Sequence, residues 1–125
     1  MSFTLTSNIP QLTRQLHSRA ARVVVETAFG IEAHIKTEMA APKSGREYGN
    51  HVASAPGEAP AIDTGLLVNS IQVEADGLAA VVGTNAEYAP VLEFGGVHIT
   101  PRPFFGPAFD AAKPEFARRL KEMVT

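Results

Sequence analysis

One pattern constrains the fold of this 125-residue chain more than any other: apolar side chains recur at helical spacing over residues 8–40. Steps of three or four residues place the following positions on one side of an α-helix: Ile9, Leu12, Leu16, Ala20, Val23, Thr27, Ile31 and Ile35. Asn8 is a candidate N-cap, with Gln11 at the capping-box position. At about 1.5 Å per residue such a helix is roughly 45 to 50 Å long. A small domain does not cover that length, so we expect part of the helix to pack on another chain.

The segment 41–61 has no apolar periodicity and contains three Pro and three Gly. Structureless stretches of about 20 residues are uncommon inside compact domains and are usually functional or disordered. One interpretation is a flexible linker. The one we prefer is an extended loop or arm that becomes ordered against a neighbouring subunit. Side chains typical of protein interfaces then supply the inter-subunit contacts, and these are Arg46, Tyr48 and His51.

Residues 70–84 alternate in the manner of a β-hairpin around Asp76-Gly77, which is a type I′ turn signal. With those two residues at the centre of the turn, the pairs on one face are Ala75 with Leu78, Val73 with Ala80 and Ile71 with Val82. The other face carries two polar and two apolar side chains, namely Gln72, Glu74, Ala79 and Val81. We expect a second layer or a partner to cover this half-apolar face.

Three further elements are expected after the hairpin. Residues 86–95 have the pattern of a short helix that begins near Tyr88 and ends at Gly95. Val97–Phe105 is interpreted as an edge strand, because its prolines cannot donate ladder hydrogen bonds. Residues 107–124 form a last helix, which Pro114 should kink or restart.

The expected fold class is α+β, in a single domain of residues 1–125. A long N-terminal helix (8–40) and a C-terminal helix pack on a small antiparallel sheet. An extended Pro/Gly-rich loop or arm (41–61) connects the first helix to residues 62–125, which hold the sheet and the C-terminal helix.

Composition narrows the functional classes. Eleven Lys and Arg against 13 Asp and Glu give a net charge of −2, which disfavours nucleic-acid binding by phosphate neutralisation. The absence of Cys excludes a disulfide scaffold, a thiol nucleophile and a thiolate zinc site. The longest apolar runs are far shorter than the roughly 20 residues of a membrane helix, and the N-terminus lacks signal-peptide features. We expect a soluble protein without membrane contact.

Asp63-Thr64-Gly65 is the tripeptide of aspartic proteases, which need two carboxylates and therefore a dimer of so short a chain. The stretch from Gly65 to Gly83 is too short for the flap and intervening strands of that fold. A helix-capping role for Asp63 and Thr64, before a short helix over residues 66–70, is the preferred interpretation.

Other candidate chemistry is weaker. His34 and Glu38 share a helix face, but two ligands do not complete a metal site. Arg118, Arg119 and Lys121 are interpreted as a solvated helix face. We predict no catalytic residue, no cofactor and no metal site.

The second half of the chain holds an ordered series of short motifs. They are Asp63-Thr64-Gly65-x-Leu67-x-Asn69-Ser70-Ile71, Val82-Gly83-Thr84-Asn85-Ala86-x-Tyr88-Ala89, Glu93-Phe94-Gly95, Arg102-Pro103-Phe104 and Pro107-Ala108, preceded by Ser44-Gly45-Arg46-x-Tyr48. The series resembles a tailed-phage family of tail components and neck proteins, named after the gene-ten product of a lambdoid coliphage. The resemblance implies that the following motif residues hold the domain fold: Asp63, Thr64, Gly65, Ser70, Gly83, Tyr88, Glu93, Phe94, Gly95, Pro103 and Phe104.

The resemblance also implies a non-enzymatic structural protein of the phage head-to-tail junction, either a neck or a tail-completion protein. Such a protein forms a ring of identical subunits between the connector or head-closure proteins and the tail terminator or tail tube. Genomic DNA passes through the ring without specific binding. The expected location is the neck or tail of the virion, and the host cytoplasm during assembly. Two alternatives stay open: a small prophage-encoded binding or regulatory module, and a dimeric aspartic protease that uses Asp63.

Overall fold

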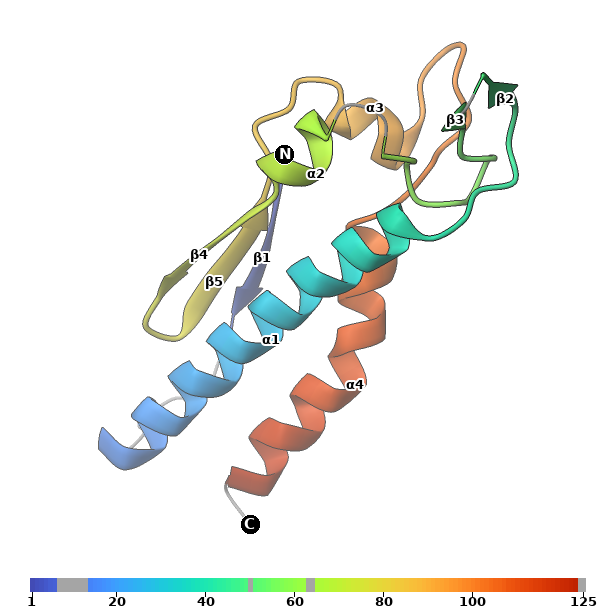
Figure 1. Cartoon of the computed structure of the whole chain (residues 1–125). Coiled ribbons are helices and arrows are strands. Elements are labelled where there is room, and N and C mark those ends of the chain that lie inside the picture. Colours follow the sequence, from blue (N-terminus) through green and yellow to red (C-terminus); the bar gives the residue numbers. More distant parts are fainter. Residues whose placement is uncertain (7–13, 50, 63–64, 124–125) are drawn as a thin grey trace.

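The computed structural model describes residues 1–6, 14–49, 51–62 and 65–123 (Figure 1). In chain order the elements are β1 (Ser2–Thr6), α1 (Arg14–Ala40), β2 (Glu47–Tyr48), β3 (His51–Val52), α2 (Leu66–Ser70), β4 (Gln72–Asp76), β5 (Ala79–Gly83), α3 (Ala89–Phe94) and α4 (Gly106–Met123). This arrangement confirms the α+β class, with a long N-terminal and a C-terminal helix packed on a small antiparallel sheet.

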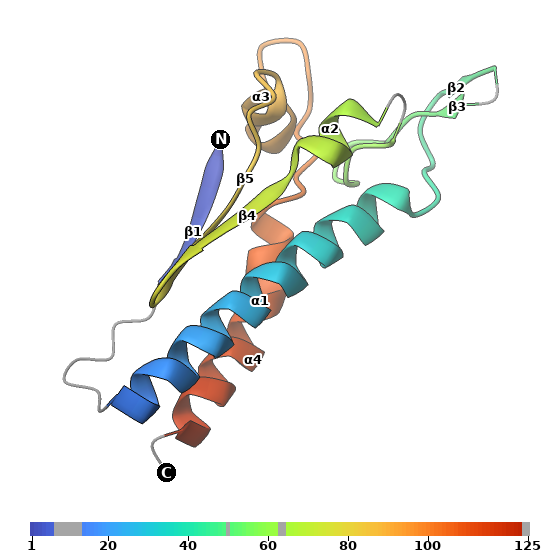
Figure 2. The same ribbon diagram turned by 60° about the vertical axis from the view of Figure 1, so that its left-hand side comes forward.

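Helix α1 confirms the predicted stripe at Ala20, Val23, Ile31 and Ile35, whereas Leu16 and Thr27 are half-buried. Its buried apolar positions are Ala20, Val23, Val24, Ala28, Ile31, Ile35 and Met39, so Val24, Ala28 and Met39 add to the predicted set. The expected N-cap Asn8 and the positions Ile9 and Leu12 lie outside the described residues. Helix α4 runs beside α1, and the sheet packs mainly on α1, while Phe3 of β1 also contacts Phe109 of α4 (Figures 1 and 2).

The three-stranded sheet has the order β1-β5-β4, with both pairings antiparallel. The predicted edge strand Val97–Phe105 is wrong, because that segment is irregular and its backbone groups bond to the end of α3 and the residues after it rather than to a strand. The Gly96 N–H donates to the Ile99 carbonyl at 3.0 Å, and the Arg102 N–H donates to the Leu92 carbonyl at 2.6 Å. The third strand is instead β1, whose alternating Ser-Phe-Thr-Leu-Thr sequence turns Phe3 and Leu5 toward the helices.

The hairpin β4–β5 is confirmed, but its predicted register is wrong by two residues. Asp76 pairs with Ala79 and Val73 pairs with Val82, so the central turn residues are Gly77 and Leu78. The first central position of both favoured hairpin turns needs a positive φ, and Gly77 supplies it with φ 60°. A shift of two residues leaves every side chain on its predicted face, because the strand repeat is two.

The outer face of the sheet is more polar than the hairpin alone suggests. Strand β1 contributes three hydroxyl side chains to this face, so its side chains are Ser2, Thr4 and Thr6, then Ala79 and Val81, then Gln72, Glu74 and Asp76. Both helices α1 and α4 lie against the opposite face (Figure 2). The outer face was predicted to be half apolar, but it is mostly polar because β1, which was not predicted from the sequence, adds its hydroxyl side chains to it.

Helix α3 begins after Tyr88, carries Pro90 in its first turn and stops at Gly95, as predicted. Helix α4 continues through Pro114 without a restart, so that part of the expectation was wrong. Both Pro114 and Asp110, whose carbonyl loses its helical donor, are exposed, and water can therefore serve that carbonyl.

Candidate interaction surface

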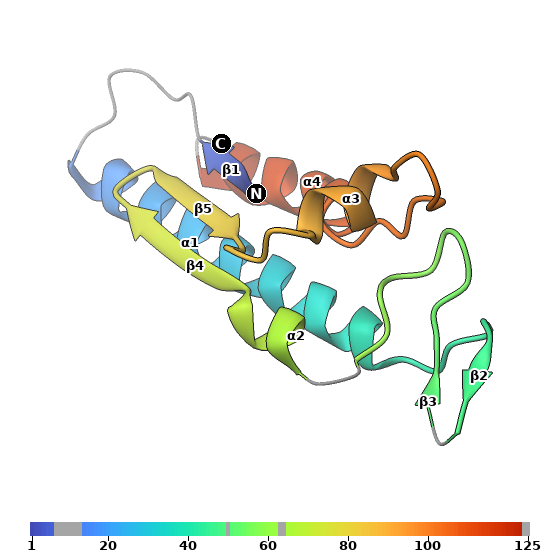
Figure 3. The same cartoon turned by 90° about the horizontal axis from the view of Figure 1, so that it is seen from above.

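The segment after α1 is not structureless, because β2 and β3 form a small hairpin that projects from the end of the domain (Figures 1 and 3). Its register pairs Glu47 with Val52 and Tyr48 with His51. At its base the Gly45 N–H donates to the Ala53 carbonyl at 2.9 Å. The missed signal was Gly-Asn at positions 49 and 50, a two-residue hairpin loop, and Gly49 has the required positive φ of 62°.

The three predicted contact residues lie on one face of this hairpin. Tyr48 and His51 are directly paired, and Arg46 stands two residues before Tyr48 on the same side. The Arg46 guanidinium lies 5.2 Å from the centre of the Tyr48 ring, which is cation–π distance. The Tyr48 side chain is 56% exposed. The fold therefore presents a cation and an aromatic ring together to solvent.

Residues 53–61 are attached to the domain rather than projecting with the hairpin. The Arg102 Nε donates to the carbonyl of buried Ser54 at 3.2 Å, and the Gly57 N–H donates to the Pro101 carbonyl at 3.0 Å. The projecting part is therefore limited to about residues 46–52, a shorter arm than the sequence suggested.

The Glu58 carboxylate closes the base of the hairpin. It accepts hydrogen bonds from the Ala55 N–H at 2.6 Å and from the Ser44 N–H and hydroxyl, each at 3.1 Å. These bonds to the charged form, the one from Ala55 first, lower the pKa of Glu58 below its ordinary value. The Glu58 carboxylate therefore connects Ser44, before the β2–β3 hairpin, with Ala55, after it.

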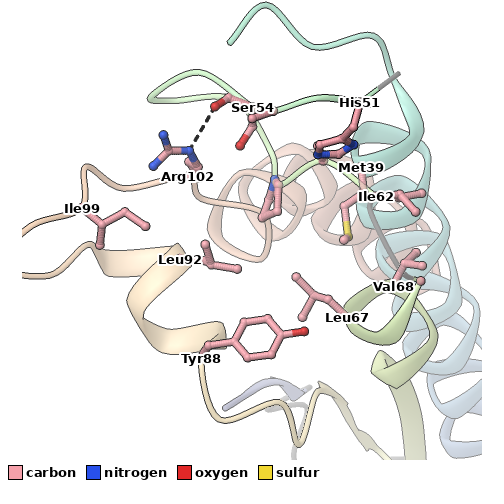
Figure 4. A pocket seen from close by; sticks show the side chains of 14 residues that line it. Met39, His51, Ser54, Ile62, Leu67, Val68, Tyr88, Leu92, Ile99 and Arg102 are labelled. Carbon is pink, nitrogen blue, oxygen red and sulfur yellow. Dashed lines mark hydrogen bonds between the residues drawn. The ribbon is translucent and has the colours of Figure 1, made fainter. Parts of the chain in front are cut away.

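A cleft of about 440 Å³ opens beside the hairpin, between α2 and α3 (Figure 4). Its apolar wall comes from Met39 on α1, Leu67 on α2 and Leu92 on α3, and its polar side chains come from His51, Tyr88 and Arg102. Mixed clefts of this kind bury an apolar group while a few polar groups orient it.

Two exposed large hydrophobic side chains, Ile62 and Tyr88, line this cleft, and others are close to lining residues along the chain. Eight such residues are found in the described chain, and seven of them line the cleft or lie within three residues of a lining residue: Tyr48, Ile62, Leu66, Tyr88, Val91, Phe94 and Val97. Val97 is 94% exposed and Phe94 is 68% exposed. We call these seven residues, with Arg46 and His51, the cleft surface. Concentrated apolar exposure of this kind marks an interaction site.

Glu93 has a structural role that explains its place in the motif series. Its carboxylate is buried and accepts three backbone N–H groups at the start of α4, from Phe104 at 3.0 Å, Phe105 at 2.8 Å and Gly106 at 3.0 Å. A negative charge at a helix N-terminus is favourable, and these N–H groups would otherwise be buried unpaired. Glu93 thereby ties the end of α3 to the beginning of α4.

Other motif residues occupy turns and close contacts. The Ser70 hydroxyl donates to the Leu67 carbonyl at 2.7 Å and lies 2.6 Å from the Thr84 hydroxyl. A Cβ on Gly83 would lie 2.9 Å from the Ser2 Cβ, so β1 requires a glycine there. Gly95 has φ 82° and ψ 172°, a combination that glycine adopts most readily.

Of the remaining motif residues, some lie in the core, some lie on the surface, and two are outside the part of the chain that the structure describes. Phe104 is buried, and Pro103 beside it is half-buried. Tyr88 and Phe94, expected to hold the fold, lie on the cleft surface at 49% and 68% exposure. Asp63 and Thr64 lie outside the described residues, and the N-cap of α2 is Gly65 with φ 84°, without a side-chain capping bond.

Of the three basic residues predicted to form a solvated face of α4, Arg118 and Arg119 form ion pairs within the chain, and Lys121 is exposed. Arg118 pairs with Glu115 and Glu122 on its own helix, which lowers the pKa of Glu115 and raises that of Arg118. Arg119 reaches across to Glu26 of α1 at 2.5 Å. These charges are largely balanced by carboxylates, unlike a basic patch that binds phosphates.

No trio of metal-ligating side chains occurs in the described part of the chain, where His34 Nε2 lies 4.0 Å from one Glu38 oxygen. None of the helices in the described ranges is long and apolar enough to cross a membrane.

Comparison with family models matches residues 3–95 to the family described as "Bacteriophage HK97-gp10, putative tail-component". Neither a curated protein nor a solved structure gives a significant match to the chain. The matched range contains β1 except for Ser2, then α1, the β2–β3 hairpin, α2 and α3 with Glu93.

Proposed function

Because this chain belongs to the bacteriophage HK97-gp10-like family of tail components, we propose that it is a neck or tail-completion protein of the head-to-tail junction. In this role it forms a ring of identical subunits between the connector or head-closure proteins and the tail terminator or tail tube. It is assembled in the host cytoplasm and ends in the virion. Its action is structural, without catalysis.

The cleft surface is the observation that carries this proposal. A chain that works alone has no use for seven exposed large hydrophobic side chains around one cleft, whereas a subunit of an assembly buries them against its neighbours. The projecting hairpin supplies an aromatic ring and an arginine, which are the side chains most enriched at the centres of interfaces.

Electrostatics also favour a channel through which DNA passes without adhering. The net charge is −2, and the arginines of α4 are paired with carboxylates. The negative net charge and the paired arginines both disfavour the binding of phosphates by counterion release. We propose that DNA passes through the ring without binding specifically to it.

The first experiment is the native mass of the purified chain at micromolar concentration. We expect a closed multiple of the 13.3 kDa subunit, because a heterologous interface closes into a ring when its rotation permits. A ring that forms only on docking would appear as a monomer alone and as a multiple when connector-bearing heads are added. A monomer under both conditions contradicts ring formation.

A second experiment replaces residues 46–52 with Gly-Gly. The Gly45 N–H and the Ala53 carbonyl already meet at 2.9 Å, so a short link closes the gap and leaves Ser54 and Glu58 in place. We expect an unchanged circular dichroism spectrum and melting temperature but failure to join heads to tails. The double variant Asp110→Ala, Lys113→Ala, which removes an exposed ion pair of α4, is the control on a different surface. Normal joining by the shortened protein would refute the role of the hairpin.

A third experiment separates the structural role from proteolysis. Asp63→Asn should alter stability at most and leave head-to-tail joining intact, whereas a dimeric aspartic protease loses its chemistry with that carboxylate. Loss of joining with unchanged stability and native mass would contradict the non-enzymatic assignment.

A further inference from the structure

A second hollow lies on the outer face of the sheet, away from the cleft surface. It has a volume of about 360 Å³. Its floor is Val81 and Gly83 of β5, and Gln72 and Glu74 of β4 stand beside them. Hydroxyl and amide side chains make up most of the remaining lining, namely Ser2, Ser70, Thr84 and Asn85. The hollow therefore offers the Val81 side chain and a carboxylate within a mainly polar lining.

Among the charged side chains that lack an ionic partner within the described chain, one lies on the hollow and one of opposite sign lies on the hairpin. Glu74 on the hollow makes no ion pair there, and Arg46 on the hairpin contacts the Tyr48 ring but no carboxylate among the described residues. Both side chains are exposed. A cation held against an aromatic ring is chemically complementary to a carboxylate that stands beside the Val81 side chain.

We propose that the hairpin of one copy docks into the sheet hollow of the next copy, with Tyr48 over Val81 and Gly83 and Arg46 paired with Glu74. This inference rests on the proposed ring and identifies its subunit interface. The hairpin and the outer face of the sheet lie on different sides of the molecule (Figures 1 and 3). One copy therefore gives its hairpin to one neighbour and receives a hairpin from the other, a heterologous contact that generates a ring or an open filament.

Glu47 of the same hairpin provides a control for charge changes at Arg46. Tyr48 and Arg46 share one face, while Glu47 points to the opposite face. Docking through the first face predicts that charge changes at Arg46 matter and that an equal change at Glu47 does not. A general attraction between charged molecules would respond to both.

Charge reversal tests the pairing. Arg46→Glu and Glu74→Arg should each raise the concentration at half-assembly about tenfold or more, because like charges then face each other at every interface. The double variant should recover assembly, and Glu47→Arg should leave it unchanged. Melting temperatures should match the wild type, since all three side chains are exposed.

Disulfide trapping tests the geometry independently, because the chain contains no cysteine. The variant Tyr48→Cys with Gln72→Cys should give a ladder of covalent multimers on mild oxidation. Tyr48→Cys or Gln72→Cys alone should give no species larger than a dimer. Native mass after oxidation should equal that of the wild-type ring.

The outcomes separate this inference from the proposed function. A wild-type ring that neither responds to the charge reversals nor forms the ladder overturns the docking contact and leaves the ring intact. Charge reversals that block joining to heads or tails without changing the ring mass assign Arg46 or Glu74 to a different virion protein, which also overturns it. A chain that stays monomeric with and without heads refutes both.

Discussion

Removing the negative charge of Glu93 should destabilise the domain while leaving its shape intact. In Glu93→Gln the amide oxygen can still accept from Phe104 and Phe105, but the new NH₂ group faces the Gly106 N–H, where Oε2 accepted at 3.0 Å. One charge-assisted bond is lost and two are weakened, and the charge at the helix N-terminus disappears. We expect a loss of about 2–4 kcal/mol in the free energy of unfolding.

Urea denaturation followed by circular dichroism measures this loss. Glu93→Ala leaves the buried N–H groups without an acceptor and should cost about 3–5 kcal/mol, a large part of the stability of a small domain. Glu87→Gln is the matched control, because Glu87 is an exposed carboxylate before the same helix and should change stability by less than about 0.5 kcal/mol. A Glu93→Gln variant within about 0.5 kcal/mol of the wild type would refute the capping role.

Three further predictions follow from single contacts. The hydrogen bonds to the Glu58 carboxylate should be present above its ordinary pKa of 4.5 and lost as the pH falls through the lowered pKa. The NMR resonance of the Ala55 amide should therefore shift with pH below 4.5, and Glu58→Gln should abolish that shift. Gly95→Ala should lower the free energy of unfolding, measured by urea denaturation, by about 2–4 kcal/mol, because its Cβ would lie 2.9 Å from the Pro101 ring. Gly77→Ala is the control and should cost about 1 kcal/mol, because a Cβ there meets no atom within 4 Å. Equal costs would contradict the steric argument. Phe3→Ala should cost about 3 kcal/mol, because its ring centre lies 5.1 Å from two core phenylalanine rings, and a cost below about 1 kcal/mol would show that β1 adds little to the core.

The elements that depend on local pattern were predictable. The stripe of α1 repeats at helical spacing over many turns, and Gly95 stops α3 because few other residues adopt its backbone angles. The hairpin register was harder, since Asp76-Gly77 and Gly77-Leu78 both place a glycine in the turn. Only the positive φ at the first central position separates them.

The candidate site was predictable in part. Arg46, Tyr48 and His51 were identified as contact residues by type, and Gly-Asn at positions 49 and 50 could have placed them on a hairpin. The cleft could not be foreseen, because its walls come from α1, α2, α3 and the loop between them. The burial of Glu93 could not be foreseen either, because its carboxylate oxygens accept hydrogen bonds from N–H groups more than ten residues later in the chain.

The sequence by itself determined the helices, the sheet hairpin and the set of residues suited to an interface, because each depends on neighbours within a few positions. Tertiary structure alone decided which strand completes the sheet. Strand β1 pairs with β5 across some 80 residues, and a close approach at Gly83 makes room for it. That pairing turned the outer sheet face polar and created the hollow beside Glu74. Long-range contacts of this kind leave no periodic trace, because they depend on which surfaces fit once the helices have packed.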